Sequence, residues 1–517
     1  MKRIIRIALV TVALYSCHKD NELTRPGDPQ QSLSRTELDQ VIWKTVKQTG
    51  TFDWNQAAPA IVYQALAQSD YVLSVGYKPE TVPRDISAII HTIDIRDQSW
   101  QKARNRVLDL IFEEERKNDP ALQLTQLEVF TEETLPIVNV RVTHQRTIEK
   151  LRSSPLVRYA EPMGYEPASG QPAARIKSSS GCGEYTANVS LVANTDFISI
   201  VPNAKASWNH PYHRISQAWT QTTGDNIKVM IIDTGIDPRQ GNLGAGFNQG
   251  AFSQGRTIER LVTLPRNTFL GIPTGSPETP DDQCGHGTAM AGVLAAPRAT
   301  NGNAVGIAYN CDLVMVRAAA DVLLDESREV KGVADAYVLA GNRLDIRVVS
   351  LSLGRITSSS QIADAVRYAY NRGKLLFCAA GTSFGWSSGW WGVIFPATMN
   401  EVSAVTGVKE NFRRCDACHD GAQTDFVVVM EKVSNGLHPL TTASSGDAPG
   451  TVGGSSVSTA QTAAMAALVW ARFPDLARDQ VLQRLIRSSN YYPNRNGNFG
   501  WGAVNAELAV SDAAALQ

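Results

Sequence analysis

The chain has 517 residues, of which 19% are charged and 43% hydrophobic, as is ordinary for a globular protein of two or three domains. Its net charge of −1 excludes a generally basic surface for nucleic acid or strongly anionic membranes. We therefore expect no nucleic-acid partner.

Residues 1–17 differ from the rest of the chain. A basic start precedes an apolar run at 7–15 that is too short to span a bilayer, which is typical of a signal peptide. The residues ending at Cys17 are similar to the lipobox of bacterial lipoproteins, which implies a lipid anchor on Cys17 and a place in the cell envelope. Simple secretion is the alternative.

The next two segments predict a helical extension and then a small domain. Residues 18–68 contain a polar tether and two helices with apolar residues at helical spacing, for which we expect only a packing role. Residues 69–165 alternate between strands and helices in the order βαββαβ, which is that of a ferredoxin-like domain. This order alone says little about function, because the fold hosts many activities.

Residues 166–206 are rich in proline, glycine and serine and are interpreted as a linker and processing region. Arg175 and Lys177 are its expected protease-accessible points.

Residues 207–517 show an α/β pattern. Near-continuous apolar runs, such as residues 228–232, predict strands buried on both faces, and helical stretches separate several of them. The expected fold is a mostly parallel sheet with helices on both faces. Sites in such sheets lie at the carboxyl ends of strands, where Asp233 follows the first of these runs.

Three segments of this region carry candidate chemistry. Asp233 ends a buried strand before Thr-Gly, and His286 and Ser456 each lie in a glycine turn that opens a helix of small residues. A serine nucleophile needs a base for its proton and a carboxylate that orients the base. Each residue also has a plain structural interpretation, as a strand-end cap, a turn histidine or an N-cap. The chain order Asp, His, Ser is one of those known for this triad.

The motifs at 233–235, 286–292 and 454–460 resemble the three catalytic motifs of subtilisin-like serine proteases. The resemblance implies an α/β fold with a parallel sheet and a serine endopeptidase. Ser456 would be the nucleophile, His286 the general base and then acid, and Asp233 the group that orients it. An esterase of the α/β-hydrolase kind is excluded, because no Gly-x-Ser-x-Gly surrounds Ser456.

The resemblance also implies a substrate site and a zymogen. One segment resembles the family's strand that pairs with the substrate backbone, and the βαββαβ unit resembles the family's propeptide. That propeptide assists folding and then inhibits by laying its C-terminal tail in the active site, until cleavage within residues 163–206. The implied substrate-binding residues are Ser350, Leu351, Ser352, Leu353, Gly354, Ala380 and Gly381.

Thr382 departs from the family pattern, which has asparagine here as a donor to the oxyanion. A threonine hydroxyl can still donate, but the side chain is shorter and its β-branch limits rotation. Losing one oxyanion donor costs roughly 10²–10³ in rate. We therefore expect a slow enzyme unless Thr382 or another group reaches the oxyanion.

The loop after Thr382 is rich in aromatic residues, which could form an apolar platform for the substrate, a plug that narrows the pocket, or loop packing. Calcium is possible near Asn242 and residues 301–303, but carboxylates are missing there, so no metal ligand is predicted. The aromatic residues are Phe384, Trp386, Trp390 and Trp391.

Six cysteines beyond Cys17 predict disulfides in an exported chain, but fifteen pairings are open. Residues 415–419 also fit the Cys-x-x-Cys-His pattern of haem attachment, and we favour a disulfide-tied loop over haem or zinc there. The six are Cys182, Cys284, Cys311, Cys378, Cys415 and Cys418.

The sequence thus predicts an exported, lipid-anchored serine endopeptidase that acts on proteins or peptides and is inhibited by its own propeptide. The alternative is a catalytically weakened member of the same fold that binds peptides at the cell surface. Thr382 and the tryptophan-rich loop favour the alternative, and the intact triad opposes it.

Overall fold

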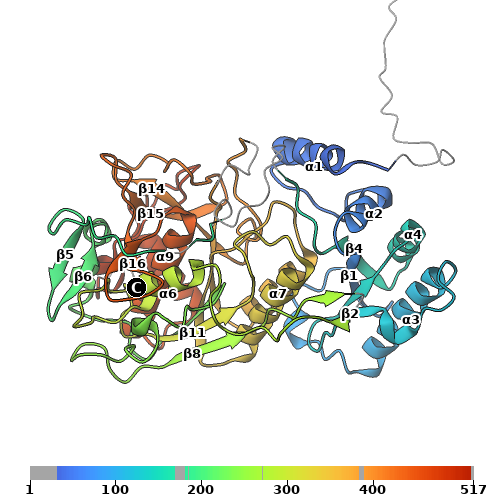
Figure 1. Ribbon diagram of the computed structural model, residues 1–517, viewed down its shortest axis with the longest axis horizontal. Helices are drawn as coiled ribbons and strands as arrows, with labels where there is room; N and C mark the ends of the chain where they lie inside the picture. The colour runs from blue at the N-terminus through green and yellow to red at the C-terminus, as the bar shows by residue number, and fades with distance from the viewer. Residues whose placement is uncertain (1–31, 169–180, 184, 270–271, 384–388, 514–517) are drawn as a thin grey trace, which may run out of the picture.

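The computed structural model describes residues 32–168, 181–183, 185–269, 272–383 and 389–513, which form two units side by side (Figure 1). The predicted signal peptide with Cys17, and Arg175, Lys177, Phe384 and Trp386, lie outside the described residues. None of the helices in the described part combines the length and the apolar character needed to cross a bilayer.

The larger unit is built on an eight-stranded sheet in the order β18-β15-β14-β13-β12-β7-β11-β8, in which every pair of neighbours is parallel. The predicted parallel α/β fold is therefore confirmed. The strands are β7 (Lys228–Asp233), β8 (Ile258–Val262), β11 (Asp312–Arg317), β12 (Ile346–Leu351), β13 (Leu375–Ala379), β14 (Ser403–Lys409), β15 (Thr424–Glu431) and β18 (Gly502–Ala503).

Helices cover both faces of this sheet, and β7 shows why its sequence is apolar throughout. Val229 and Ile231 pack with α6 and α9, whereas Met230 and Ile232 point to the other face, toward α7 and α8. Residues 454–470 of α9 are all buried, which explains their small and apolar composition. The helices are α5 (Ile215–Ala218), α6 (His286–Ala295), α7 (Ser327–Asn342), α8 (Ser360–Asn371), α9 (Gly454–Arg472), α10 (Arg478–Arg487) and α11 (Ala506–Ala509).

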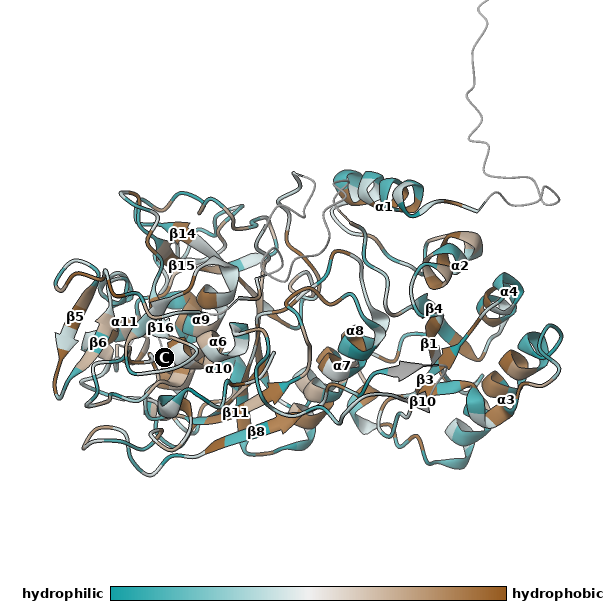
Figure 2. Cartoon of the chain, in the orientation of Figure 1, coloured by the Kyte–Doolittle hydropathy of each residue, from teal (hydrophilic) through white to brown (hydrophobic). Residues whose placement is uncertain are grey.

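The smaller unit has the βαββαβ order expected from the sequence, with an antiparallel sheet in the order β2-β3-β1-β4. Its helices carry both apolar and polar residues (Figure 2), as elements with one buried face should. The elements are β1 (Val72–Tyr77), α3 (Gln98–Glu115), β2 (Glu128–Phe130), β3 (Ile137–Arg141), α4 (Gln145–Ser153) and β4 (Val157–Pro162), preceded by α1 (Arg35–Thr49) and α2 (Pro59–Ala67).

The two units share one continuous hydrophobic cluster that joins the smaller sheet to α7 and α8. Buried polar contacts cross the same surface. Gln361 of α8 accepts hydrogen bonds from Ser74 (2.8 Å) and Asn139 (2.7 Å), and Arg158 forms an ion pair with Asp364 (2.5 Å). The smaller unit is therefore seated on the outer helices of the larger one.

The expected linker is folded onto the larger unit where the structure describes it after residue 180. Cys182 forms a disulfide with Cys284, and the Asn188 amide donates to Pro449 O (2.8 Å). The hairpins of the larger unit are β5 (Phe197–Ile200) with β6 (Ala204–Ser207), β9 (Thr268–Phe269) with β10 (Ile272–Pro273), and β16 (Leu440–Thr442) with β17 (Pro449–Thr451).

Candidate active site

Asp233 and His286 meet at the carboxyl end of β7. The strand ends at Asp233, α6 begins at His286, and His286 Nδ1 lies 2.8 Å from Asp233 Oδ1. Both side chains are buried. A proton on Nδ1 leaves the lone pair of Nε2 available to accept a proton, as a general base requires.

The pKa of His286 is set by opposing effects. Burial lowers it, but the Asp233 carboxylate, with smaller contributions from Asp282 and Asp321, outweighs burial, and the pKa lies above its ordinary value. The imidazolium that would form during catalysis is therefore stabilised by this environment.

Asp282 holds the turn before α6 in place, and sequence reasoning missed it. Its Oδ1 accepts from the amides of Cys284 (2.9 Å) and Gly285 (2.7 Å) and from Thr234 Oγ1 (2.9 Å). Its Oδ2 accepts from the Thr288 amide (2.9 Å) and hydroxyl (2.7 Å). An aspartate just ahead of a helix start is the available signal, because such residues satisfy first-turn amides.

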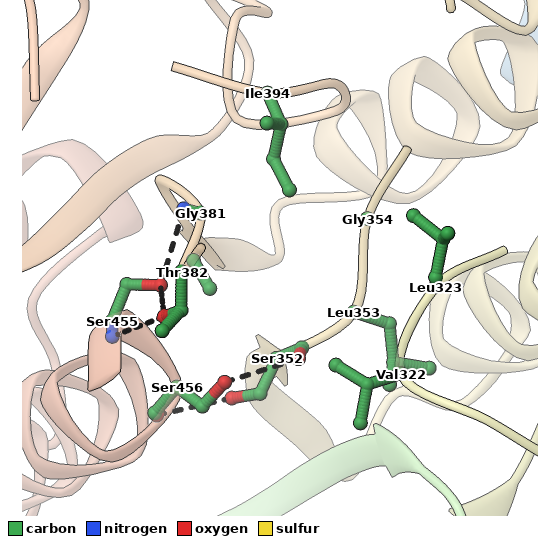
Figure 3. Close-up of a pocket in the computed structure, with 11 residues that line it drawn as sticks. Val322, Leu323, Ser352, Leu353, Gly354, Gly381, Thr382, Ile394, Ser455 and Ser456 are labelled. Carbon is green, nitrogen blue, oxygen red and sulfur yellow. Dashed lines mark hydrogen bonds between the residues drawn. The ribbon is translucent and has the colours of Figure 1, made fainter. Parts of the chain in front are cut away.

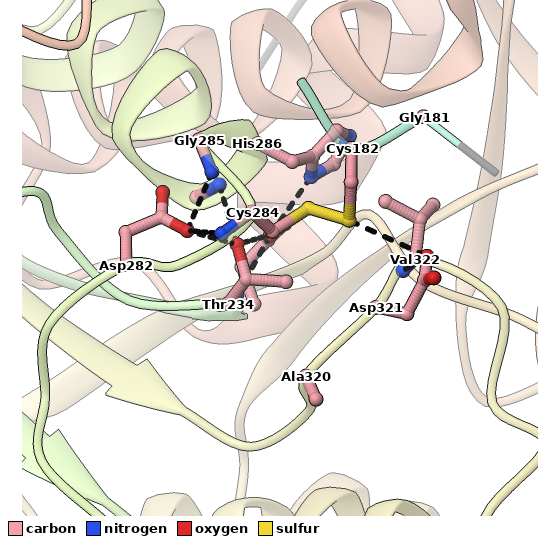
Figure 4. The surroundings of a disulfide bond; sticks show 12 residues. Gly181, Cys182, Thr234, Asp282, Cys284, Gly285, His286, Ala320, Asp321 and Val322 are labelled. Atoms are coloured by element: carbon pink, nitrogen blue, oxygen red, sulfur yellow. Dashed lines mark hydrogen bonds and ion pairs between the residues drawn. A yellow bond between two sulfur atoms is a disulfide. The ribbon is translucent and has the colours of Figure 1, made fainter. Parts of the chain in front are cut away.

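The Cys182–Cys284 disulfide brings a distant segment onto the same turn (Figure 4). The Gly183 amide donates to Cys284 O (2.8 Å), and a Cβ at Gly285 would lie 2.3 Å from Gly183 O. Gly285 also has φ +89°, so both backbone conformation and space require glycine there. The histidine turn is thus covered by residues 181–183.

Ser456 lies in the first turn of α9, beside Ser352 (Figure 3). Its hydroxyl donates to Ser352 O (3.3 Å), and the Ser352 hydroxyl donates to Ser456 O (3.1 Å). In this conformation the Ser456 hydroxyl is therefore in contact with the backbone that follows β12. First-turn amides lack intrahelical acceptors, so the Ser456 amide is placed to bind negative charge.

Thr382 reaches the same turn, but its hydroxyl contacts Ser455. Thr382 Oγ1 accepts from the Ser455 amide (2.9 Å) and bonds with Ser455 Oγ (2.9 Å), which in turn accepts from the Gly381 amide (3.1 Å). A Cβ at Gly454 would lie 2.7 Å from Thr382 Oγ1. Thr382 therefore packs closely against the start of α9, and its role toward an oxyanion stays a prediction.

A narrow cavity of ≈ 20 Å³ opens beside Ser456, with room for about one water molecule (Figure 3). Ile394 limits its size, because a Cβ at Gly354 would already lie 2.5 Å from Ile394 Cδ1. The cavity is lined by Val322, Leu323, Ser352, Leu353, Gly354, Ala379, Gly381, Thr382, Ile394, Ser455 and Ser456.

Three residues of the expected substrate-binding set are engaged with the protein's own backbone. Ser350 and Leu351 lie inside β12, between β7 and β13, so their backbones have no free edge. The Ala380 amide donates to Val405 O, and the Ala380 carbonyl accepts from the Ile394 amide. The contact of these residues with substrate stays a prediction.

Gly354 keeps the expected position beside Ser456, but its backbone is paired with the protein's own chain. Its amide donates to Val322 O (3.3 Å), and its carbonyl accepts from the Leu324 amide (3.0 Å). A substrate strand would have to displace residues 322–324 or bind beside them.

The aromatic loop packs against neighbouring residues where it is described. Trp390 contacts Trp43 of α1 (6.5 Å between ring centroids) and His419 (5.7 Å), and Trp391 also contacts His419. Of the three interpretations, these contacts favour loop packing.

The six cysteines in the described part of the chain form two disulfides, Cys182–Cys284 and Cys415–Cys418, and two buried thiols, Cys311 and Cys378. The disulfide within residues 415–418 leaves no thiol there for haem or zinc.

The amides proposed for calcium are bonded to one another. Asn242 Oδ1 accepts from Gln249 (2.7 Å) and Asn301 (2.8 Å), and Asn301 also donates to Asp447 (2.7 Å). In the described ranges no group of three or more histidine, cysteine, aspartate or glutamate residues could hold a metal ion. These residues therefore do not fit a calcium site in their present arrangement.

The chain is similar to known proteins in sequence and in structure. The sequence profile of the subtilase family matches residues 224–502. M-protease of Shouchella clausii is 30% identical over 291 residues, which cover 56% of this chain and 65% of that protein. Subtilisin Savinase of Lederbergia lenta is 29% identical over 291 residues, covering 56% and 92%. The crystal structure of MycP1 with its N-terminal propeptide removed is 21% identical, with a TM-score of 0.46, and covers 59% of this chain and 97% of that one.

Proposed function

Because the chain belongs to the subtilase family of serine peptidases, we propose that it is a serine endopeptidase with Asp233, His286 and Ser456 as its triad. The single observation that carries the proposal is the 2.8 Å bond between Asp233 and His286 at the end of β7, whose neighbour β12 leads into Ser352 beside Ser456. The buried carboxylate supports the histidine as a base, and the glycine turn presents the serine.

The proposed reaction begins with rotation of the Ser456 hydroxyl away from Ser352 O. His286 Nε2 takes the hydroxyl proton as Oγ attacks the scissile carbonyl, and Asp233 stabilises the imidazolium. The same proton passes to the leaving amine, which releases the first product and leaves an acyl group on Ser456. Water then repeats the sequence, and His286 returns its proton to Ser456 Oγ.

The oxyanion would be held by the Ser456 amide and by Thr382. The amide is fixed by the start of α9 and needs no rearrangement. Either oxygen can be the donor in the contact between Thr382 and Ser455, and Thr382 Oγ1 also accepts from the Ser455 amide. A Thr382 hydroxyl that accepts both bonds keeps its proton for the oxyanion, whereas one that donates to Ser455 must first exchange that bond.

We propose that residues 69–165 act as an inhibitory propeptide. Their sheet is seated on α7 and α8, and the tail that follows β4 reaches Arg355, one residue beyond the cavity-lining Gly354. The pairing of Gly354 with residues 322–324 describes a closed cleft, as a zymogen would have. Cleavage within 163–206 would separate the units.

Export with a lipid on Cys17 is part of the proposal and rests on the basic and apolar start of the sequence. Two disulfides support an oxidising compartment. A catalytically weakened peptide-binding surface lipoprotein is the second candidate, and the engagement of Thr382 with Ser455 favours it.

The test compares the chain lacking residues 1–17 with its Ser456→Ala and Ser458→Ala variants. Ser458 lies in the same helix and bonds only within it to Gly454 O (3.3 Å), so it is the matched control. We expect self-cleavage within 163–206 and labelling by a fluorophosphonate for the parent and Ser458→Ala, and neither for Ser456→Ala. A parent chain that neither cuts itself nor labels after removal of the N-terminal unit would leave the binding protein as the better interpretation.

A further inference from the structure

A buried ion pair lies next to the cavity and joins the two units. Arg355 and Glu166 are both fully buried, and Arg355 Nε lies 2.9 Å from Glu166 Oε1. Glu166 comes from the tail after β4, whereas Arg355 directly follows Gly354 in the larger unit.

The Glu166 carboxylate accepts hydrogen bonds from one short segment, residues 355–357. The Ile356 amide donates to Oε2 (2.7 Å), the Thr357 amide donates to Oε1 (3.3 Å), and the Thr357 hydroxyl also donates to Oε1. With the guanidinium they surround a carboxylate with charge-assisted hydrogen bonds, which are the strongest kind in proteins. The segment 355–357 is thus a built carboxylate site.

Arg355 depends on the tail for most of its partners. Its terminal nitrogens donate to Met163 O (2.9 Å) and Tyr165 O (3.0 Å), and within the larger unit they donate to Thr357 Oγ1 (3.0 Å). If the tail leaves after cleavage, the guanidinium loses Glu166 and both carbonyls. The guanidinium and the amides of the vacated site then favour another chain with a carboxylate and backbone carbonyls, because charge-assisted hydrogen bonds are the strong ones.

The position of this site relative to Ser456 follows from the backbone. Ser352 is hydrogen-bonded to Ser456, and Arg355 lies three residues further along an extended segment, which is about 10 Å at ~3.3 Å per residue. Glu166 precedes most of the region in which cleavage is proposed, so in the uncut chain its carboxylate lies on the amino-terminal side of the bond to be cut. A peptide bound in the same way has its carboxylate about three or four residues before the bond at Ser456.

We propose that Arg355, Ile356 and Thr357 form a subsite for a glutamate side chain of the substrate, about three or four residues before the scissile bond. Glu166 occupies this subsite in the uncut chain. The substrate role of this subsite rests on the proposed peptidase function. The carboxylate site itself does not depend on catalysis.

The first experiment tests the site without requiring activity. In the chain lacking residues 1–17, Glu166→Gly removes the carboxylate and leaves space for a small acid. We expect its Tm to fall by several degrees and to be restored in part by propionate, but not by propionamide, which has the same shape without the charge. The variant Glu149→Gly, at an exposed position, is the control for general effects of the added salt on Tm.

The double variant Glu166→Gly with Arg355→Met decides whether the arginine is responsible. We expect no response to propionate, because the guanidinium is gone. Equal stabilisation by propionate and propionamide, or equal rescue of the double variant, would overturn the carboxylate site.

The second experiment tests the substrate preference with the self-processed enzyme and peptides that differ only by glutamate or glutamine three or four residues before the cut. A preference of about tenfold or more in kcat/KM for glutamate is expected, since a hydrogen bond to a charged group is worth that much. In Arg355→Met the ratio should approach one. Rescue by propionate with no glutamate preference would overturn the substrate role and leave the site as an anchor for the tail. A chain that shows rescue but never processes would count against the peptidase, not against the site.

Discussion

The histidine side and the serine side of the candidate site are held in different ways. On the histidine side, Asp233 is bonded to His286, Asp282 accepts hydrogen bonds from the turn before α6, and a disulfide covers this turn. On the serine side, the Ser456 hydroxyl is directed to Ser352 and the Thr382 hydroxyl contacts Ser455. The groups that hold the histidine are in place, whereas the Ser456 hydroxyl must turn away from Ser352 O before it can attack, and of the two proposed oxyanion donors only the Ser456 amide is fixed.

For the proposed peptidase reaction, this difference predicts which side of the site limits the rate. Preorganised dipoles lower a barrier because they need no rearrangement during the reaction. The histidine side meets this condition, and the oxyanion side meets it only through the Ser456 amide. Changes on the first side should therefore abolish catalysis, while changes on the second could lower or raise it.

The largest effect is expected for Asp233→Asn. The amide would favour the wrong tautomer of His286, and kcat should fall by about 10⁴, as such replacements do in serine proteases, with little change in KM. Kinetics on a chromogenic peptide measure this, with the exposed Asp225→Asn as control. A fall of less than about tenfold would show that the histidine side is not the organised one.

Replacement of Thr382 tests the other side. Thr382→Ala should lower kcat by roughly 10²–10³ if the hydroxyl reaches the oxyanion, and Thr382→Asn should raise it, because the longer amide need not leave Ser455. Thr382→Ser keeps the hydroxyl and should stay near the parent. Equal rates in all four proteins would show that the oxyanion is held elsewhere.

The two disulfides should differ in their contribution to stability. Cys182–Cys284 spans 102 residues and Cys415–Cys418 spans 3, so in the chain-entropy model their loss costs roughly 5 and roughly 2 kcal/mol. Urea unfolding of the paired Cys→Ser variants, both in the Ser456→Ala background, measures the difference. A larger loss for the shorter loop would contradict the model and point to a local packing role near Thr382.

The smallest effect is expected on the pH profile. His286 must be neutral to act as a base, so its raised pKa shifts the acid limb of kcat/KM upward. Asp321→Asn removes one of the negative charges responsible, so the limb should move to lower pH by a fraction of a unit, while Asp512→Asn should leave it in place. A shift to higher pH would have the wrong sign for this explanation.

Sequence reasoning predicted the fold, which the structure confirms, and proposed the triad, because the signals for both are local. A run of apolar residues ending at Asp233 predicts a buried strand, and glycine turns before small residues predict buried helix starts at His286 and Ser456. Each of these depends on neighbours in the sequence and on backbone conformation.

The contacts that sequence reasoning missed join distant residues. Glu166 and Arg355 are 189 residues apart, and the pairing of Cys182 with Cys284 was one of fifteen possibilities. The motif around Ser350 and Leu351 does not reveal where a central strand stops and its exposed continuation begins, and the structure has this strand end at Leu351.

The seating of the smaller sheet on α7 and α8 has a consequence for the proposed lipid anchor. Cys17 and this sheet both precede the region in which cleavage is proposed, so a lipid on Cys17 would stay with the smaller unit after a cut. The buried contacts at α7 and α8, which include those of Gln361 and Asp364, would then join the larger unit to the membrane. In that case the time that the larger unit spends at the membrane is set by the dissociation rate of this interface, and not by the moment of cleavage.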